Sequence, residues 1–221
     1  MTPANIAGMG AVLGLEVMAV TDHNTCRNCP SFAAACDRFG IRAIFGMELT
    51  TLEEVHVLCY LPDLKSALEW GEMVYSRLPS LANVPAFFGN QIVYDENDRI
   101  SGEENIMLAQ ATTIPFGEVD RLIRKFGGVM VPAHINKESN SLIRNLGFIP
   151  EDSTFRSVEI QIDDDIFSLK HSFPYLGQCR MFRNSDAHTL EAINEPVNII
   201  CPENESYSAI LSYIGNGFVE F

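Results

Sequence analysis

The stretch VMAVTDHN, residues 17–24, sets the pattern from which the fold can be predicted. Its first four residues form an apolar, β-like run, and polar residues that include Asp22 and His23 follow directly. A run that is apolar on both faces is typical of a parallel strand covered by helices. The loops after such strands hold the catalytic groups of α/β barrels, so we expect His23 to lie at the mouth of a barrel.

Two later stretches repeat this arrangement. PAHI at residues 132–135 and NSDAH at residues 184–188 each follow an apolar run. We therefore expect His23, His134, Asp186 and His188 to converge at the barrel mouth. Imidazole and carboxylate together are ligands for zinc, manganese and iron. A metal-dependent hydrolase is the leading hypothesis.

The rest of the chain alternates between helix and strand patterns. Thr2 and Pro3 read as an N-cap followed by proline at the first helical position, and Gly14 ends that helix. Further helices are expected near 31–39, 64–77, 119–126, 166–171 and 207–214, and further strands near 41–45, 55–60, 129–131, 158–162, 179–182 and 197–200. The alternation favours a parallel barrel or a doubly wound sheet. We expect one domain over residues 1–221, with an insertion at about 64–118 over the barrel mouth.

Composition narrows the class of protein. A chain of 221 residues, 47% hydrophobic, can bury a sizeable core in one domain. It has no apolar run near the roughly 20 residues that span a bilayer and no basic segment leading into a signal peptide, so we expect a soluble, cytoplasmic protein. The net charge of −14 weighs against binding to long nucleic acid, although a small phosphate substrate held by metal ions remains compatible with it.

The six cysteines are interpreted as reduced thiols, because a chain of this length does not need disulfides to fold. Cys26 and Cys29 form a C-x-x-C pair, but no second pair completes a zinc site. Idle thiols are the favoured reading, with a metal or redox role as the alternative.

Five motifs occur together in one order: TDHN at 21–24, GME at 46–48, EVH at 54–56, PAH at 132–134 and SDAH at 185–188. This ordered set resembles the motifs of the polymerase and histidinol phosphatase (PHP) domain phosphoesterases, from residue 1 to about residue 201. The resemblance implies a distorted (β/α)7 barrel with up to three divalent metal ions, usually zinc, manganese or iron, at the carboxyl ends of the strands.

The resemblance also implies the metal ligands on this chain: His23, Glu48, His56, His134, Asp186 and His188. Glu48 would bridge two ions, and His56 and His134 would complete one of these two sites. Asp186 would help to hold the other.

A third ion would be bound by His23 and His188. Asp22 would orient the adjacent histidine loop without itself binding metal.

One family motif is absent from this sequence. Members begin with a strand ending in His-x-His, and no His-x-His occurs in the 221 residues. The resemblance therefore implies that the first strand is missing and that only the site of Glu48, His56 and His134 keeps its full ligand set. Two explanations are open: a start codon assigned at an internal methionine of a longer natural protein, or a genuinely shortened product.

The expected reaction is hydrolysis of a phosphomonoester or phosphodiester by metal-bound hydroxide. No Gly-x-Ser-x-Gly elbow or P-loop offers a competing mechanism. The resemblance points to a small nucleotide or short oligonucleotide as substrate, with histidinol phosphate as the alternative. A second hypothesis is an inactive or regulatory metal-binding remnant. An uncovered strand edge would also favour a homodimer.

Overall fold

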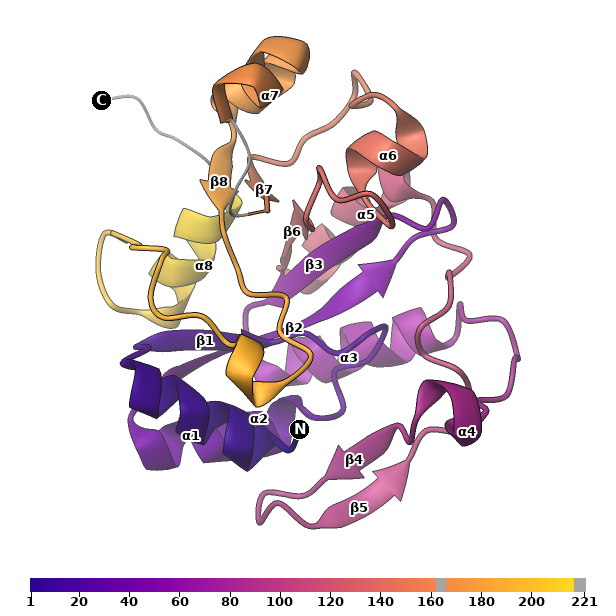
Figure 1. Cartoon of the computed structure of the whole chain (residues 1–221), viewed down its shortest axis with the longest axis vertical. Coiled ribbons are helices and arrows are strands. Elements are labelled where there is room, and N and C mark those ends of the chain that lie inside the picture. Colours follow the sequence, from indigo (N-terminus) through magenta and orange to yellow (C-terminus); the bar gives the residue numbers. More distant parts are fainter. Residues whose placement is uncertain (162–165, 217–221) are drawn as a thin grey trace.

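The computed structural model describes residues 1–161 and 166–216 (Figure 1). Its α-helices are α1 (Pro3–Leu13), α2 (Cys29–Phe39), α3 (Leu64–Tyr75), α4 (Pro85–Phe88), α5 (Phe116–Ile123), α6 (Leu142–Leu146), α7 (Ile166–Ser172) and α8 (Tyr207–Gly215). Its strands are β1 (Val17–Val20), β2 (Arg42–Thr50), β3 (His56–Leu61), β4 (Ile92–Tyr94), β5 (Ile100–Glu103), β6 (Val129–Pro132), β7 (Ser157–Glu159) and β8 (Arg180–Phe182). Short 3-10 turns η1 (Arg124–Phe126), η2 (Pro174–Gln178) and η3 (Leu190–Ala192) complete the chain.

The main sheet has the order β1-β2-β3-β6. β1 is parallel to β2, but β3 is antiparallel to both β2 and β6. The expectation of a wholly parallel arrangement is therefore wrong at β3. The reason is the length of the connection, because parallel neighbours need a crossover of a dozen or more residues and only residues 51–55 separate β2 from β3.

β7 and β8 form a separate parallel pair above the main sheet (Figure 1). The Ile135 amide donates to the Glu159 carbonyl at 2.9 Å, which ties the chain after β6 to the end of β7. β1 has one strand neighbour and β8 has one, so no closed barrel is formed by the part of the chain that the structure describes.

The strand expected at 197–200 is not a strand. The Asn198 side chain takes its place: its Oδ1 accepts from the Arg183 amide at 2.8 Å and its Nδ2 donates to the Arg183 carbonyl at 3.0 Å. One amide side chain thus satisfies both backbone groups of Arg183, as a neighbouring strand would.

The main sheet is covered on both faces, and β3 shows how. Val57, Cys59 and Leu61 belong to the core formed with α3 and α5, whereas Leu58 and Tyr60 belong to the core formed with α8. This alternation follows from the two-residue period of a strand. An α/β layer arrangement results, with the sheet between two groups of helices.

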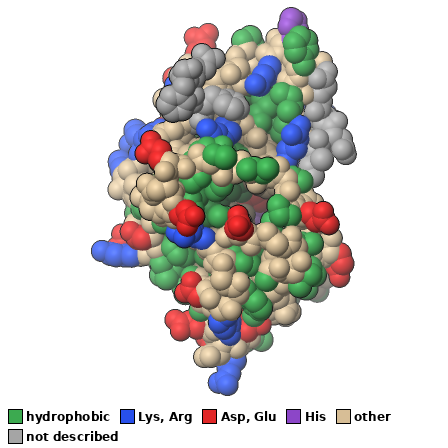
Figure 2. All heavy atoms as spheres, turned by 90° about the vertical axis from the view of Figure 1, so that its left-hand side faces the viewer, with side chains coloured by type: hydrophobic (Ala, Val, Ile, Leu, Met, Phe, Trp, Pro, Cys, Tyr) green, Lys and Arg blue, Asp and Glu red, His purple; other side chains and the backbone are tan. Residues whose placement is uncertain are grey.

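β1 is less covered than its sequence predicts. Met18 is buried between α1 and α2, but Val17, Ala19 and Val20 are half-buried. Its second edge borders a cavity of about 270 Å³ between β1 and β8, with Ile44 and Tyr60 among the lining residues. Figure 2 shows a hollow in this face, with hydrophobic side chains above and beside it and acidic side chains below it.

The segment 64–118 begins inside the core and then leaves it. Trp70 and Val74 of α3 are fully buried, whereas Phe87 and Phe88 of α4 are exposed. The hairpin β4–β5 follows and lies at the opposite end of the molecule from β7 and β8 (Figure 1). The expected insertion over this range stays a prediction. Within the described residues, no helix has the length and apolarity to cross a membrane.

Several helix ends agree with the sequence. The Thr2 side chain accepts from the Asn5 amide at 3.4 Å, and Gly14 ends α1 with a left-handed φ of 77°. The Asp63 carboxylate accepts from the Ser66 amide at 2.7 Å at the start of α3. These caps are local interactions, which explains why they could be predicted.

Gly46 offers a test of the close contact between β2 and β3. A Cβ there would lie 2.5 Å from the Cys59 carbonyl oxygen, whereas a Cβ at Gly117 would meet nothing within 4 Å. We expect Gly46→Ala to lower the free energy of unfolding by about 1–3 kcal/mol, because the backbone of β2 or β3 must move to make room for the methyl group. Gly117→Ala in α5 should be neutral or stabilising by up to about 1 kcal/mol. Urea unfolding would measure both, and equal stabilities would contradict this packing.

Candidate metal centre

The Glu48 carboxylate lies among three imidazole rings. His56 Nδ1 is 3.0 Å from Glu48 Oε1, His134 Nε2 is 3.3 Å from the same oxygen, and His23 Nδ1 is 3.3 Å from Oε2. The ring centroids of His23 and His56 are 5.1 Å apart, and those of His56 and His134 are 5.3 Å apart. Four side chains from four segments therefore form one compact cluster.

Backbone pairing places His23 beside Glu48. The Glu48 amide donates to the Asp22 carbonyl at 3.1 Å, and the Asn24 amide donates to the Glu48 carbonyl at 2.9 Å. The parallel pairing of β1 with β2 thus continues past the end of β1 to a bridge between His23 and Glu48. Glu48 itself lies within β2, which extends well beyond the expected strand at 41–45.

The antiparallel pairing of β3 supplies the other two rings. His56 is the first residue of β3 and pairs with Thr50, two residues after Glu48. The Ala133 amide donates to the His56 carbonyl at 3.0 Å, so His134 follows next to it. His134 has a left-handed φ of 27°, a conformation that non-glycine residues seldom adopt.

Burial and the imidazoles act in opposite directions on Glu48. Burial alone would raise the pKa of its carboxyl group, but hydrogen bonding and charge interaction with His134 and His56, together with His23, hold that pKa well below its usual value. Burial lowers the pKa of His23 despite the attraction of Glu48. Burial also opposes charge on His134, but Glu48 outweighs it and raises the pKa of that ring.

The donor set fits a divalent cation. The nearest ligand atoms of His23, Glu48 and His56 lie within 4.8 Å of one another. His23 Nδ1 and both ring nitrogens of His134 are buried without a hydrogen-bond partner of good geometry among the described residues. Buried polar atoms are normally paired, and imidazole nitrogens with a carboxylate are ligands of zinc, manganese and iron.

Asp186 and His188 lie along the same cavity, which has a volume of about 480 Å³ and is also lined by Asp22, His23 and Glu48. Asp186 forms an ion pair with Lys137 at 2.9 Å. His188 Nδ1 is 2.9 Å from the Asp186 carbonyl oxygen, and its side chain is 73% exposed. The structure therefore gathers three of the six predicted ligands around a fourth, Glu48, and places the other two at the cavity wall. The metal-binding role of all six stays a prediction.

The Asp22 carboxylate accepts a hydrogen bond from Asn28 rather than from an imidazole. Its Oδ2 accepts from Asn28 Nδ2 at 2.9 Å, and Asn28 Oδ1 accepts from the Tyr94 amide at 3.0 Å. Burial raises the pKa of Asp22, and the hydrogen bond from Asn28 opposes that shift. Its expected role in orienting the histidine loop stays a prediction.

Three residues of the site were not predicted from the sequence: Lys137, Glu159 and Asn184. Glu159 is 4% exposed, lines the cavity, and has its pKa raised by burial. The sequence did contain a signal for Glu159, because an acidic residue between Val158 and Ile160 in an apolar strand is unusual. Lys137 lies in a loop whose position the sequence pattern does not reveal.

Comparison with known proteins shows the fold. No protein-family model and no curated protein matches the sequence. Endonuclease Q from Pyrococcus furiosus, a lesion-specific endonuclease, superposes with a TM-score of 0.67 and 15% identity over 97% of this chain and 51% of that chain. A protein from Bifidobacterium adolescentis described as a metal-dependent phosphoesterase gives a TM-score of 0.65 and 14% identity, over 97% and 91% of the two chains.

Endonuclease Q bound to a 27-mer duplex with an abasic lesion also matches, with a TM-score of 0.57 and 15% identity over 84% of this chain and 44% of that chain. This chain spans about half of the length of endonuclease Q. At these identities the similarity establishes a shared mixed α/β fold, and function has to be argued from the site itself.

Metal binding at this cluster should depend on pH. Because Glu48 raises the pKa of His134, protons compete with a cation for that ring more strongly than they would for a free imidazole. We expect the affinity for Zn²⁺ or Mn²⁺ to fall as the pH is lowered, with a slope that approaches about tenfold per unit once the pH is below the raised pKa of His134. Isothermal titration in buffers of different ionisation enthalpy would give the number of protons released. A pH-independent affinity, or the same slope in His134→Ala, would contradict the assignment.

Proposed function

We propose that this protein is a metal-dependent phosphoesterase that hydrolyses a phosphomonoester or phosphodiester of a small nucleotide or short oligonucleotide. The observation that carries the proposal is the contact of three imidazoles, His23, His56 and His134, with the buried Glu48 carboxylate beside a cavity of about 480 Å³. The fold shared with a metal-dependent phosphoesterase and a DNA endonuclease supports it.

The proposed ligand sets are those that the sequence motifs imply. Glu48, His56 and His134 would hold one cation, zinc, manganese or iron, and His23 with His188 would hold another. Asp186 would join Glu48 at a shared site. A divalent cation bound there lowers the pKa of a coordinated water and neutralises negative charge on the phosphoryl group.

The charge of the cavity explains why a cation is needed. Asp22, Glu48, Glu159 and Asp186 all line it, and Arg183 is the one Lys or Arg among its described lining residues. A phosphate group would be repelled by these carboxylates unless cations screened them. The side chains therefore act in two ways: the imidazoles and carboxylates retain cations, and the cations make the cavity attractive to an anion.

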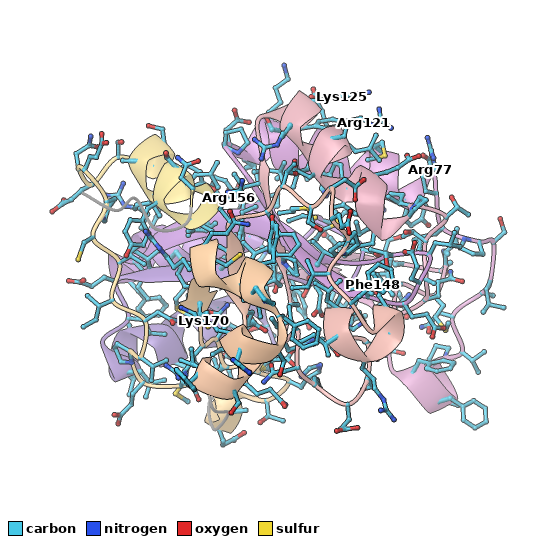
Figure 3. All side chains as sticks on the ribbon, turned by 90° about the horizontal axis from the view of Figure 1, so that it is seen from above. Arg77, Arg121, Lys125, Phe148, Arg156 and Lys170 are labelled. Atoms are coloured by element: carbon cyan, nitrogen blue, oxygen red, sulfur yellow. The ribbon has the colours of Figure 1, made fainter. Side chains whose placement is uncertain are left out.

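The volume of the cavity and the net charge of the protein favour a small substrate. A cavity of about 480 Å³ is in the usual range for small-molecule sites. The net charge of −14 disfavours long nucleic acid. Arg77, Arg121 and Lys125, which Figure 3 labels, lie at one edge of the molecule near α3, α5 and η1, and none of them lines the cavity.

A second function is supported by a specific observation. The Asp186 carboxylate is bound to Lys137 at 2.9 Å rather than to the imidazole cluster. A protein that binds a cation through Glu48, His56 and His134 without assembling a complete catalytic site would be an inactive or regulatory metal-binding protein.

The central experiment measures metal content and hydrolysis together. Purified protein with Mn²⁺ or Zn²⁺ is assayed on nucleoside monophosphates, nucleoside bisphosphates, short oligonucleotides, histidinol phosphate and a duplex with an abasic lesion. We expect phosphate or oligonucleotide products from the nucleotide substrates. His134→Ala should lower metal affinity by at least about tenfold and activity with it, because one of three protein ligands is lost.

His171→Ala is the matched control, because His171 is an exposed histidine of α7 outside the cluster. This variant should behave as the wild type. Metal binding without hydrolysis of any substrate would favour the regulatory function, and cleavage of the lesion duplex alone would replace the small substrate by DNA. Absence of metal binding would overturn both functions.

A further inference from the structure

Glu159 is a buried acidic side chain that forms no ion pair with another described residue. It is 4% exposed, and no Lys, Arg or His side chain lies within ion-pair distance of it in the described ranges 1–161 and 166–216. Such a group is costly to bury unless its oxygens accept hydrogen bonds. The two donors that Glu159 meets come from the two loops that carry His134 and Asp186.

Each carboxylate oxygen of Glu159 accepts a hydrogen bond from one of the two loops. Oε1 accepts from the backbone amide of His134 at 3.2 Å, and Oε2 accepts from Asn184 Nδ2 at 2.6 Å. The end of β7 is therefore a bridge between the chain after β6 and the chain after β8. Both of these loops contain a residue with a left-handed backbone, because φ is 27° at His134 and 46° at Asp186. Residues other than glycine keep such a conformation only where the surroundings hold it.

The direction of these hydrogen bonds is set by backbone groups. Arg183 donates its amide to Asn198 Oδ1 and accepts from Asn198 Nδ2, so the Asn198 side chain cannot be reversed. Asn198 Nδ2 also donates to Asn184 Oδ1 at 3.0 Å, which leaves Asn184 Nδ2 facing Glu159. Glu159 therefore meets two donors and must offer two acceptors.

We propose that Glu159 and Asn184 form a coupled pair of positioning residues that holds the His134 loop at a defined distance from the Asp186 loop. The inference rests on the proposed metal centre, to which His134 and Asp186 contribute. It requires no direct contact of Glu159 or Asn184 with the metal. Their role is to keep an imidazole and a carboxylate from two separate loops in the geometry that one centre needs.

An exchange of donor and acceptor tests the pair. Glu159→Gln has one acceptor for two donors, so one hydrogen bond is lost in either amide orientation. Asn184→Asp places two carboxylates against each other. In the double variant, the amide nitrogen introduced at position 159 donates to the carboxylate introduced at position 184, and the amide oxygen accepts from the His134 backbone. The new carboxylate still accepts from Asn198, and the net charge of the pair is unchanged.

We expect each single variant to weaken Zn²⁺ or Mn²⁺ binding by about tenfold or more, and the double variant to recover to within about threefold of wild type. The visible spectrum of the Co²⁺-loaded protein gives a second readout, because it follows ligand geometry. It should change in the single variants and return in the double variant. Asp63→Asn is the matched control, because Asp63 Oδ1 also accepts from a backbone amide, that of Ser66, at 2.7 Å, but at the start of α3.

The outcomes separate this inference from the proposed function. If wild type binds metal and Glu159→Gln binds it equally well, or the double variant fails to recover, the pair is not a positioning device. If wild type binds no metal, the proposed function fails, and the amide exchange rate of His134 in the metal-free protein then decides. Exchange that is faster in Glu159→Gln and slow again in the double variant supports the pair, and unchanged exchange overturns it.

Discussion

The ionisation of the buried Glu48 carboxylate is the constraint on which the rest of the site depends. A carboxylate that is 7% exposed needs hydrogen bonds or positive charge nearby. Three rings supply them, and each is delivered by a different strand contact: His23 by parallel pairing of β1, His56 by the antiparallel start of β3, and His134 by the chain after β6. A bound cation would replace these contacts with stronger ones while keeping the same positions.

This arrangement also accounts for the asymmetry of the site. The side around Glu48 is built on the main sheet, whose strands fix their residues by paired backbone groups. The side around Asp186 is built on the chain after β8, where the side-chain amides of Asn184 and Asn198 make hydrogen bonds of the kind that a neighbouring strand makes. Loops held by a few side chains adjust more readily than a sheet. The fold that this chain shares with other proteins does not by itself select the substrate, because one fold supports many chemistries.

Much of the local structure could be predicted from the residues themselves. Thr2 and Gly14 marked the two ends of α1 correctly, because caps satisfy backbone groups a few residues away. The placement of His23 and His134 directly after strands was also correct, since an apolar run and the polar residue that follows it are adjacent in sequence.

What the sequence by itself determined was therefore most of the helices, most of the strands and the kinds of side chain that follow them. The tertiary structure alone decided that β3 runs antiparallel, that residues 197–200 form no strand, that Asp186 pairs with Lys137, and that Glu159 joins two loops. Each of these depends on partners far away in the chain. A pattern of apolar and polar residues specifies which face of a strand is buried, but not which strand lies beside it or which distant donor meets a buried acceptor.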